Sequence, residues 1–329
     1  MTSSTVLRAA LFFVAILGVV PFTVAAGENP SPKPKVIMIV GAPGQPEFAT
    51  NFQRQAELWR QTCARGGVET VRIGTGSESI TNDFESLRHA LAGEQKDCPE
   101  ALWLVLIGHG TFDGKEARFN LRGPDVTASD LEEWLKPFHR PVVVIDTSAA
   151  SAPFLNKLSA TNRLIVTATR SGNEKNFTRF GIQLAEALSS EESDLDKDGQ
   201  VSLLEAFITA SAQVSVFYRT EGRLATEHAL LDDDGDGRGT PADWFRGIRT
   251  VKKPEGSAAA DGIRAHQLHL VLSPVEQALP NDVRVKRDAL ELEISRLRAT
   301  KFQRPAEDYY REIENLLLQM AEIYGLQPE

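Results

Sequence analysis

Unbroken runs of apolar residues, separated by stretches of helical periodicity, dominate the hydrophobic pattern of this chain. The runs lie at Val36–Val40, Leu102–Ile107, Val142–Ile145 and Leu164–Thr167, and a more mixed run spans Val68–Ile73. A short continuous apolar run bounded by turn residues is typical of a strand that is buried on both faces, as in parallel sheets. The pattern therefore predicts five strands of a mainly parallel sheet.

Amphipathic stretches between these runs predict helices. Strands that alternate with helices in this way indicate an α/β fold, in which a mainly parallel sheet is sandwiched by helices. Either Thr127 or Ser129 is expected to cap one of the helices, and Ser129 with Glu132 has the spacing of a capping box. Helices are expected at Phe48–Arg65, Asp83–Ala92, up to Leu135, at Thr178–Leu188 and at Leu203–Tyr218.

The C-terminal part of the chain has a different pattern. Residues 251–265 are expected to form a linker, and His266–Leu272 a possible last strand. Residues 282–329 are mostly helical in pattern, and Pro305 divides them. The simplest prediction is a C-terminal helical hairpin that follows a core domain at residues 36–250.

The N-terminus has the features of a secretory signal. Arg8 precedes the apolar stretch Ala9–Val20, and Val24-Ala25-Ala26 provides small residues for cleavage before Gly27. Residues 1–26 are therefore expected to be a signal peptide and residues 27–35 a Pro-rich linker, which predicts a protein exported to the periplasm or the extracellular space. The apolar stretch is short for a bilayer span, so no stable membrane span is expected after cleavage.

The charge of the chain narrows its possible binding partners, and its two cysteines leave a disulfide open. The 329 residues have a net charge of -9 and a sequence pI of about 5.3, without a basic stripe, which argues against nucleic acid as the main partner. Cys63 and Cys98 are the two cysteines. In an oxidising compartment they could pair, and two free thiols are the alternative.

One acidic segment has the spacing of a calcium-binding EF-hand loop. Positions one, three and five of the twelve-residue loop are filled by Asp194, Asp196 and Asp198, and Gly199 occupies the sharp turn at position six. Position seven is Gln200, which would offer its backbone carbonyl, and position twelve is Glu205, which would bind bidentately. Helical patterns flank the segment on both sides. It predicts a Ca²⁺ site.

A second acidic segment matches the same loop less well. Asp232, Asp234 and Asp236 are correctly spaced, but the residue at position twelve is Asp243, whose shorter side chain suits bidentate calcium binding less well. A second Ca²⁺ site and a flexible surface loop are both open interpretations.

Two side chains with catalytic potential follow neighbouring predicted strands. His109 stands between two glycines after the strand that starts at Leu102, and Ser148 follows the strand that starts at Val142. Ligands of open α/β sheets bind at the carboxyl ends of the strands. The sequence therefore predicts that these two side chains lie near a binding crevice.

Taken in order, these motifs resemble the caspase-like fold, nearest to the legumain-like and metacaspase-like cysteine peptidases. The resemblance spans roughly residues 36–250. It depends on the strand that ends in Gly108-His109-Gly110, on VVVIDTSAAS at 142–151, on LIVTATRSGNE at 164–174, and on FTRFGIQLAEAL followed by DLDKDGQVSLLEAF.

The resemblance implies a peptidase site with one departure. His109 would be the general base, but Ser148 stands where the family has its nucleophilic cysteine. A thiol is partly ionised near neutral pH, whereas a serine needs a histidine within hydrogen-bond reach and a third group that orients it; Asp113 is a candidate for that group. The backbone amides of Gly110 and Ser148 would stabilise an oxyanion, and Arg170 would bind an acidic side chain of the substrate.

The sequence thus predicts an exported, calcium-binding homologue of these peptidases, impaired in catalysis, that binds a peptide or protein ligand in the crevice. Two alternatives stay open: an active peptidase or hydrolase that uses His109 and Ser148, and a calcium-dependent interaction module in which the sheet is only a scaffold.

Overall fold

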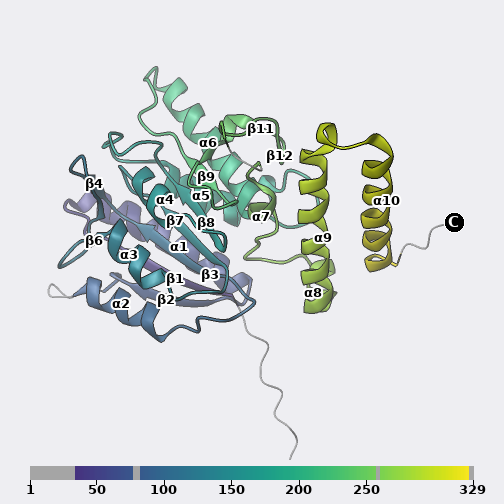
Figure 1. Ribbon diagram of the computed structural model, residues 1–329. Helices are drawn as coiled ribbons and strands as arrows, with labels where there is room; N and C mark the ends of the chain where they lie inside the picture. Colours follow the sequence, from purple (N-terminus) through teal and green to yellow (C-terminus); the bar gives the residue numbers. More distant parts are fainter. Residues whose placement is uncertain (1–33, 77–81, 257–259, 326–329) are drawn as a thin grey trace, which may run out of the picture. The chain divides into compact units, whose positions relative to one another are not determined.

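The computed structural model describes residues 34–76, 82–256 and 260–325 of the chain, so the predicted signal peptide lies outside the described residues. In the described part, a seven-stranded sheet has the order β10-β9-β8-β7-β3-β1-β2 (Figure 1). The five strands β1, β2, β3, β7 and β8 are parallel, and β9 and β10 are antiparallel. The predicted mainly parallel α/β fold is confirmed. The strands are β1 (Lys35–Val40), β2 (Glu69–Ile73), β3 (Leu102–Ile107), β7 (Val142–Asp146), β8 (Arg163–Thr167), β9 (Leu230–Asp232) and β10 (Thr240–Pro241).

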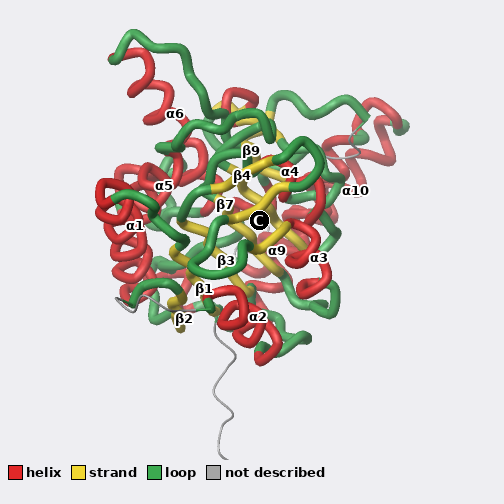
Figure 2. The backbone as a smooth tube through the Cα atoms, turned by 90° about the vertical axis from the view of Figure 1, so that its left-hand side faces the viewer, coloured by secondary structure: helices red, strands yellow, loops and turns green. Residues whose placement is uncertain are grey.

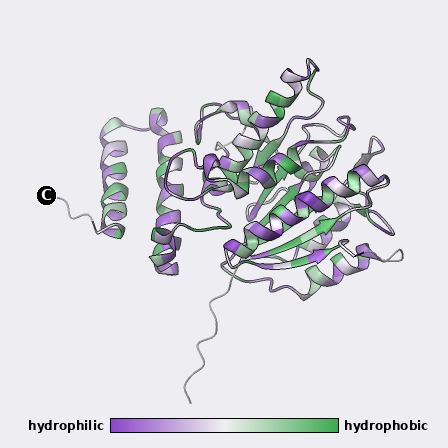
Figure 3. Cartoon of the chain, turned by 180° about the vertical axis from the view of Figure 1, so that it is seen from behind, coloured by the Kyte–Doolittle hydropathy of each residue, from purple (hydrophilic) through white to green (hydrophobic). Residues whose placement is uncertain are grey.

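Helices cover both faces of this sheet, which explains the unbroken apolar runs. Successive side chains of a strand point to opposite faces, so Ile37 packs into one core and Met38 into the other, and both are fully buried. In Figure 2 the strands lie between two groups of helices, and in Figure 3 the strands are largely hydrophobic. One face packs against α1 (Pro46–Arg65), α5 (Phe180–Ser189) and α6 (Leu203–Thr220), and the other against α2 (Asp83–Gly93), α3 (Ala128–Leu135) and α4 (Ala152–Leu158).

The helix α3 begins with an N-cap that the sequence predicts, with one correction to its capping box. Thr127 caps α3, and the reciprocal partner in its capping box is Asp130 rather than the expected pair Ser129 and Glu132. Shorter elements lie between and after the main strands. They are β4 (Gly110–Phe112), β5 (Ala117–Phe119), β6 (Val126–Thr127), β11 (Phe245–Arg246), β12 (Arg249–Thr250) and the 3₁₀ turns η1 (Glu191–Ser193), η2 (Ala242–Trp244) and η3 (Lys301–Gln303).

The prediction of a strand at His266–Leu272 is wrong. Residues 263–266 form the short helix α7 (Ile263–His266), and His269 makes only an isolated bridge with Ser202. The Asp233 carboxylate accepts hydrogen bonds from the Gly262 and Ala265 amides, so this segment turns into a helix instead of extending along a sheet edge.

The C-terminal helical hairpin is present as predicted. Pro305 separates its two long helices, and their contact buries a small apolar cluster of its own that includes Leu290, Ile294 and Leu316. Among the described helices, none combines the length and the apolar character that a membrane span requires. The elements of this region are α8 (Pro274–Ala278), α9 (Asn281–Ala299) and α10 (Ala306–Ile323).

Both cysteines are free thiols in this structure. Cys63 lies on the buried face of α1, and burial raises the pKa of its thiol. Because the thiolate is the reactive form, this environment makes Cys63 a poor nucleophile.

Candidate functional site

His109 and Ser148 follow two adjacent parallel strands, as the sequence predicts. Each residue stands two positions beyond the end of its strand, β3 for His109 and β7 for Ser148, and Leu106 pairs with Asp146 at the end of the register. Both residues therefore lie at the carboxyl edge of the sheet.

Three aromatic rings surround the imidazole of His109. The ring centroids of Phe48, Phe52 and Phe177 lie 4.7, 5.1 and 6.1 Å from that of His109. Nε2 of His109 lies 3.2 Å from the carbonyl oxygen of Pro43. A carbonyl can only accept, so Nε2 is the donor in this contact.

The Ser148 hydroxyl is directed to a different partner from the one that catalysis needs. It donates to Oδ1 of Asp146 at 2.6 Å, and the Ser148 side chain is completely buried. Within the described residues no hydrogen bond joins His109 and Ser148. A Cβ atom added to Gly110 would lie only 2.5 Å from the Ser148 Oγ, which shows how tightly the backbone of Gly110 covers this hydroxyl.

The expected oxyanion and orienting groups are also engaged elsewhere. The Ser148 amide donates to Oδ1 of Asp146 at 2.9 Å, so this N–H is not directed at a substrate position. Asp113 lies in the turn between β4 and β5, where it accepts hydrogen bonds from two turn amides and from the Arg118 guanidinium. These bonds hold the pKa of Asp113 well below its usual range, and they make it a turn residue rather than a partner of His109.

Arg170, just beyond the end of β8, is exposed and pairs with a carboxylate of the protein itself. Its Nε lies 3.4 Å from a carboxylate oxygen of Glu174, and the same oxygen is 2.6 Å from Nδ1 of His228. The backbone carbonyl of Glu174 accepts from the amide of Ala150, whose φ of 55° is a left-handed conformation. Glu174 and His228 were not among the sequence candidates. Glu174 ties the loop after β8 to the loop that carries Ser148, and His228 ties Glu174 to the segment before β9.

The first acidic loop brings together the carboxylates that the sequence selects. One carboxylate oxygen from each of Asp194, Asp196 and Asp198 lies within 4.8 Å of the other two. Glu205, in the first turn of α6, reaches back and accepts hydrogen bonds from the amides of Leu195 and Asp196. Helices α5 and α6 and the turn η1 flank the loop, which gives it the predicted helix-loop-helix arrangement.

The second loop repeats the hydrogen bonds of the first, position by position. In both loops the first aspartate accepts from the amides at positions four and six, which are Lys197 and Gly199 in the first loop and Gly235 and Gly237 in the second. The carboxylates at positions three and five each accept from the amide two residues later. All four residues at positions four and six have positive φ, between 65° and 88°.

The twelfth position is where the two loops differ. In the first loop Glu205 accepts from the amides at positions two and three. In the second loop the amides at these positions, those of Asp233 and Asp234, donate to Oδ1 of Asp261, at 2.9 and 3.3 Å. The other oxygen of Asp261 accepts from the hydroxyl of Thr240, at position nine, just as Glu205 accepts from Ser202.

Asp261 therefore occupies the place that the sequence assigned to Asp243. The second loop lies between strands β9 and β10 instead of two helices, so position twelve is not turned back onto the loop, and Asp243 is exposed. Asp261 is only 2% exposed, and its carboxylate lies within 4.8 Å of those of Asp232 and Asp234. Sequence reasoning missed Asp261 because it lies 18 residues beyond Asp243 in a segment expected to be a linker.

Buried carboxylates of like charge face one another at this second loop. Burial and the nearby Asp233 raise the pKa of Asp261 to about 8, and burial raises that of Asp234 to about 6. These raised pKa values reflect the cost of placing several carboxylates close together in a buried site.

Comparisons with known proteins give a structural likeness alone. No protein-family model and no curated protein sequence matches this chain. Among solved structures, a structural-genomics target from Geobacter sulfurreducens matches with a TM-score of 0.41 and 11% identity, over 61% of this chain and 93% of its own. Caspase-1 from Spodoptera frugiperda matches with a TM-score of 0.39 and 8% identity, over 61% and 86% of the two chains, and the Drosophila initiator caspase Dronc with 0.41 and 13%, over 61% and 80%. Two of these three structures are caspases. At these TM-scores and identities, the comparisons assign no activity to this chain.

Proposed function

We propose that this protein is a non-catalytic, calcium-binding homologue of caspase-like peptidases. The observation that carries the proposal is the position-by-position correspondence between the two acidic loops, including the replacement of a helical Glu205 by a distant Asp261. Two unrelated stretches of chain arrive at the same arrangement of carboxylates, although one lies between helices and the other between strands.

The donor set of both loops suits Ca²⁺. Calcium takes six to eight oxygen ligands from carboxylates, carbonyls and water, and this chemistry matches loops rich in aspartate. The bound ion would offset the mutual repulsion of the carboxylates. The first site would use Asp194, Asp196, Asp198, the Gln200 carbonyl and Glu205, and the second Asp232, Asp234, Asp236 and Asp261.

The absence of catalysis is proposed from the partners of the expected catalytic pair. A serine nucleophile needs a base that takes its proton, and a histidine must be within hydrogen-bond reach to do so. Here the hydroxyl of Ser148 donates to Asp146, while Nε2 of His109 is held by the carbonyl of Pro43. The short loop after β7 keeps Ser148 buried, so a substrate carbonyl has no open path to its Oγ.

A peptidase assay tests this part of the proposal. Wild type, Ser148→Ala and Ser148→Cys are incubated with a mixed peptide library at about 1 mM Ca²⁺, in the affinity range of extracellular calcium modules. We expect no cleavage by any of the three, because the side chain at position 148 is buried and faces Asp146. Cleavage by wild type or by Ser148→Cys that disappears when His109→Ala is added would contradict the proposal. A thermal melt of each variant serves as the control for folding.

Export from the cytoplasm stays a prediction that depends on residues 1–26. It fits the calcium proposal, because extracellular calcium modules act at ion concentrations of about 10⁻⁴–10⁻³ M, where weak sites are filled. The ligand of the carboxyl edge is proposed to be a peptide or protein, as the resemblance implies.

A further inference from the structure

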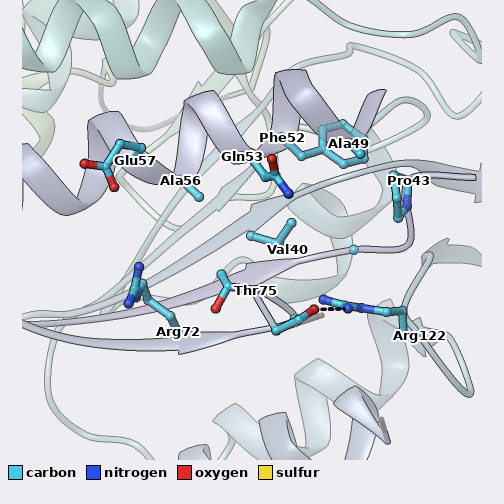
Figure 4. Close-up of a pocket in the computed structure, with 13 residues that line it drawn as sticks. Val40, Pro43, Ala49, Phe52, Gln53, Ala56, Glu57, Arg72, Thr75 and Arg122 are labelled. Atoms are coloured by element: carbon cyan, nitrogen blue, oxygen red, sulfur yellow. Dashed lines mark hydrogen bonds between the residues drawn. The ribbon is translucent and has the colours of Figure 1, made fainter. Parts of the chain in front are cut away.

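A groove of about 360 Å³ lies beside the carboxyl edge of the sheet, between α1 and the ends of β1 and β2 (Figure 4). Its volume is at the lower end of the range for small-molecule sites. Neither the calcium loops nor the pair His109 and Ser148 line it.

The interior of this groove is apolar. Val40, Phe52 and Ala56 line it and are almost completely buried, and Ala49 and Pro43 extend the apolar lining toward its end. Gly74 shapes this lining, because its φ of 78° turns the chain and because a Cβ there would lie 2.0 Å from the carbonyl oxygen of Val40. Such a surface is suited to the hydrocarbon part of a small ligand.

Two arginines stand on the wall opposite α1. Figure 4 shows Arg72 and Arg122 at opposite ends of this wall, with Thr75 between them, while Gln53 points toward them from α1. Arg122 is fixed, because its Nε lies 3.3 Å from Asp83 and its Nη1 donates to the carbonyl of Gly76 at 2.7 Å.

Within the described part of the chain, Arg72 is the groove arginine that lacks an ion pair, although the Glu57 carboxylate interacts with it electrostatically. Its nearest carboxylate in the groove is that of Glu57, and both oxygens of Glu57 already accept hydrogen bonds from Arg60, at 2.8 and 2.6 Å. Among the described residues, no carboxylate comes within ion-pair distance of Arg72. The exposed guanidinium at this end of the groove therefore provides a donor pair for an incoming anion.

We infer that this groove binds a small organic carboxylate, with the carboxylate on Arg72 and the hydrocarbon part over Val40, Phe52 and Ala56. A planar guanidinium matches a carboxylate with two parallel hydrogen bonds, and this pairing is among the stronger contacts available to a small ligand. Arg122, Thr75 and Gln53 are polar neighbours on the same rim. This inference goes beyond the proposed function, and it does not depend on calcium.

The probe for the test is phenylacetate, with phenylacetamide as its neutral counterpart. Ligand-observed NMR titration of the full chain, with and without Ca²⁺, is expected to give saturable phenylacetate binding in the millimolar range or tighter, and binding of the amide that is roughly tenfold weaker. Equal binding of both probes would overturn the inference, since the groove would then recognise only apolar surface. No saturable phenylacetate binding would overturn it as well.

Two variants test whether phenylacetate binds in this groove. Arg72→Met is expected to weaken phenylacetate binding roughly tenfold or more, and Ala49→Leu is expected to block the groove from the half-exposed face of α1. Arg219→Met, at an exposed position near the end of α6, is the matched control and should bind as wild type does. Unchanged binding by both groove variants, at unchanged melting temperature, would locate the ligand elsewhere and contradict the inference.

Discussion

Saturating Ca²⁺ is expected to raise the melting temperature of the protein by roughly 5–10 °C for each loop that it fills. An ion that binds only the folded state adds about 2.7 kcal/mol to the free energy of unfolding at one hundred times its Kd. In a domain of this size, one kcal/mol corresponds to about 2–4 °C. Thermal unfolding in calcium and in a chelator measures the effect directly.

Isosteric variants distinguish the contributions of the two loops to the calcium-dependent rise in melting temperature. Glu205→Gln is expected to remove the increment of the first loop, and Asp261→Asn that of the second. Asp243→Asn is the matched control for Asp261→Asn, because Asp243 is exposed and lies away from the cluster. It should keep the full calcium response.

The melting temperature in chelator distinguishes a loss of calcium binding from a loss of folding stability. Because the pKa of Asp261 is raised to about 8, its carboxyl is mostly protonated near pH 7 without calcium. Asp261→Asn therefore changes the charge of the calcium-free cluster little, and the variant without calcium should melt close to wild type. A variant that loses the calcium response while keeping its calcium-free stability identifies Asp261 as a ligand. If Asp243→Asn abolished the second increment and Asp261→Asn did not, the assignment of position twelve would be wrong.

The strands were predictable from the sequence because a strand that is buried on both faces requires an unbroken run of apolar residues. Every residue of β3 is buried, so the run from Leu102 to Ile107 carries no polar interruption. The segment from His266 was not predictable in the same way. Its pattern suits an edge strand, but the amides of Gly262 and Ala265 are satisfied by Asp233, which is distant in sequence, and the chain turns into α7.

The acidic loops also depend on tertiary contacts that the sequence pattern does not show. A motif with fixed spacing predicts which carboxylates meet at the loop when the element after the loop is a helix, since the first turn of α6 returns Glu205 to the loop. After the second loop the chain continues as β10, and the geometry that would bring Asp243 back is lost. The vacated position is filled by Asp261 through tertiary contact alone, for which one sequence holds no signal.

The orientation of the Ser148 hydroxyl was partly predictable from the sequence. A serine two residues after an aspartate can donate to that carboxylate locally, and this short-range bond competes with any longer-range partner. The resemblance to peptidases predicts His109 as the partner of this hydroxyl instead. In the structure the local bond is made, at 2.6 Å.

This bond leads to the second large effect, which concerns pH. Asp146 is completely buried, and burial raises the pKa of its carboxyl to about 6, from an ordinary value of 3.8. A raised folded-state pKa means that the folded protein holds this proton more tightly than the unfolded chain does. The contribution of Asp146 is therefore fully present below pH 3.8, and it is lost as the pH rises through 6.

The expected loss from this residue is about 3 kcal/mol between pH 4 and pH 7, from a shift of about two pKa units. Asp146→Asn should abolish that part of the pH dependence, because asparagine keeps an acceptor for Ser148 and carries no charge. Urea unfolding of both proteins at several pH values, in chelator throughout, gives a difference curve in which the other titrating groups cancel. A flat difference curve would show that Asp146 does not titrate in this range.

Substitutions at Ser148 should move the same curve in a predictable direction. The hydroxyl and the amide of Ser148 both donate to Asp146, and these bonds hold the pKa of Asp146 below the value that burial alone would give. Ser148→Ala removes the hydroxyl donor, and Ser148→Cys replaces it with the weak donor of a thiol. Both variants should lose more stability than wild type between pH 4 and pH 7. Such a result would give the hydroxyl at position 148 a role in keeping a buried carboxylate ionised, a role that the cysteine of an active peptidase is poorly suited to fill.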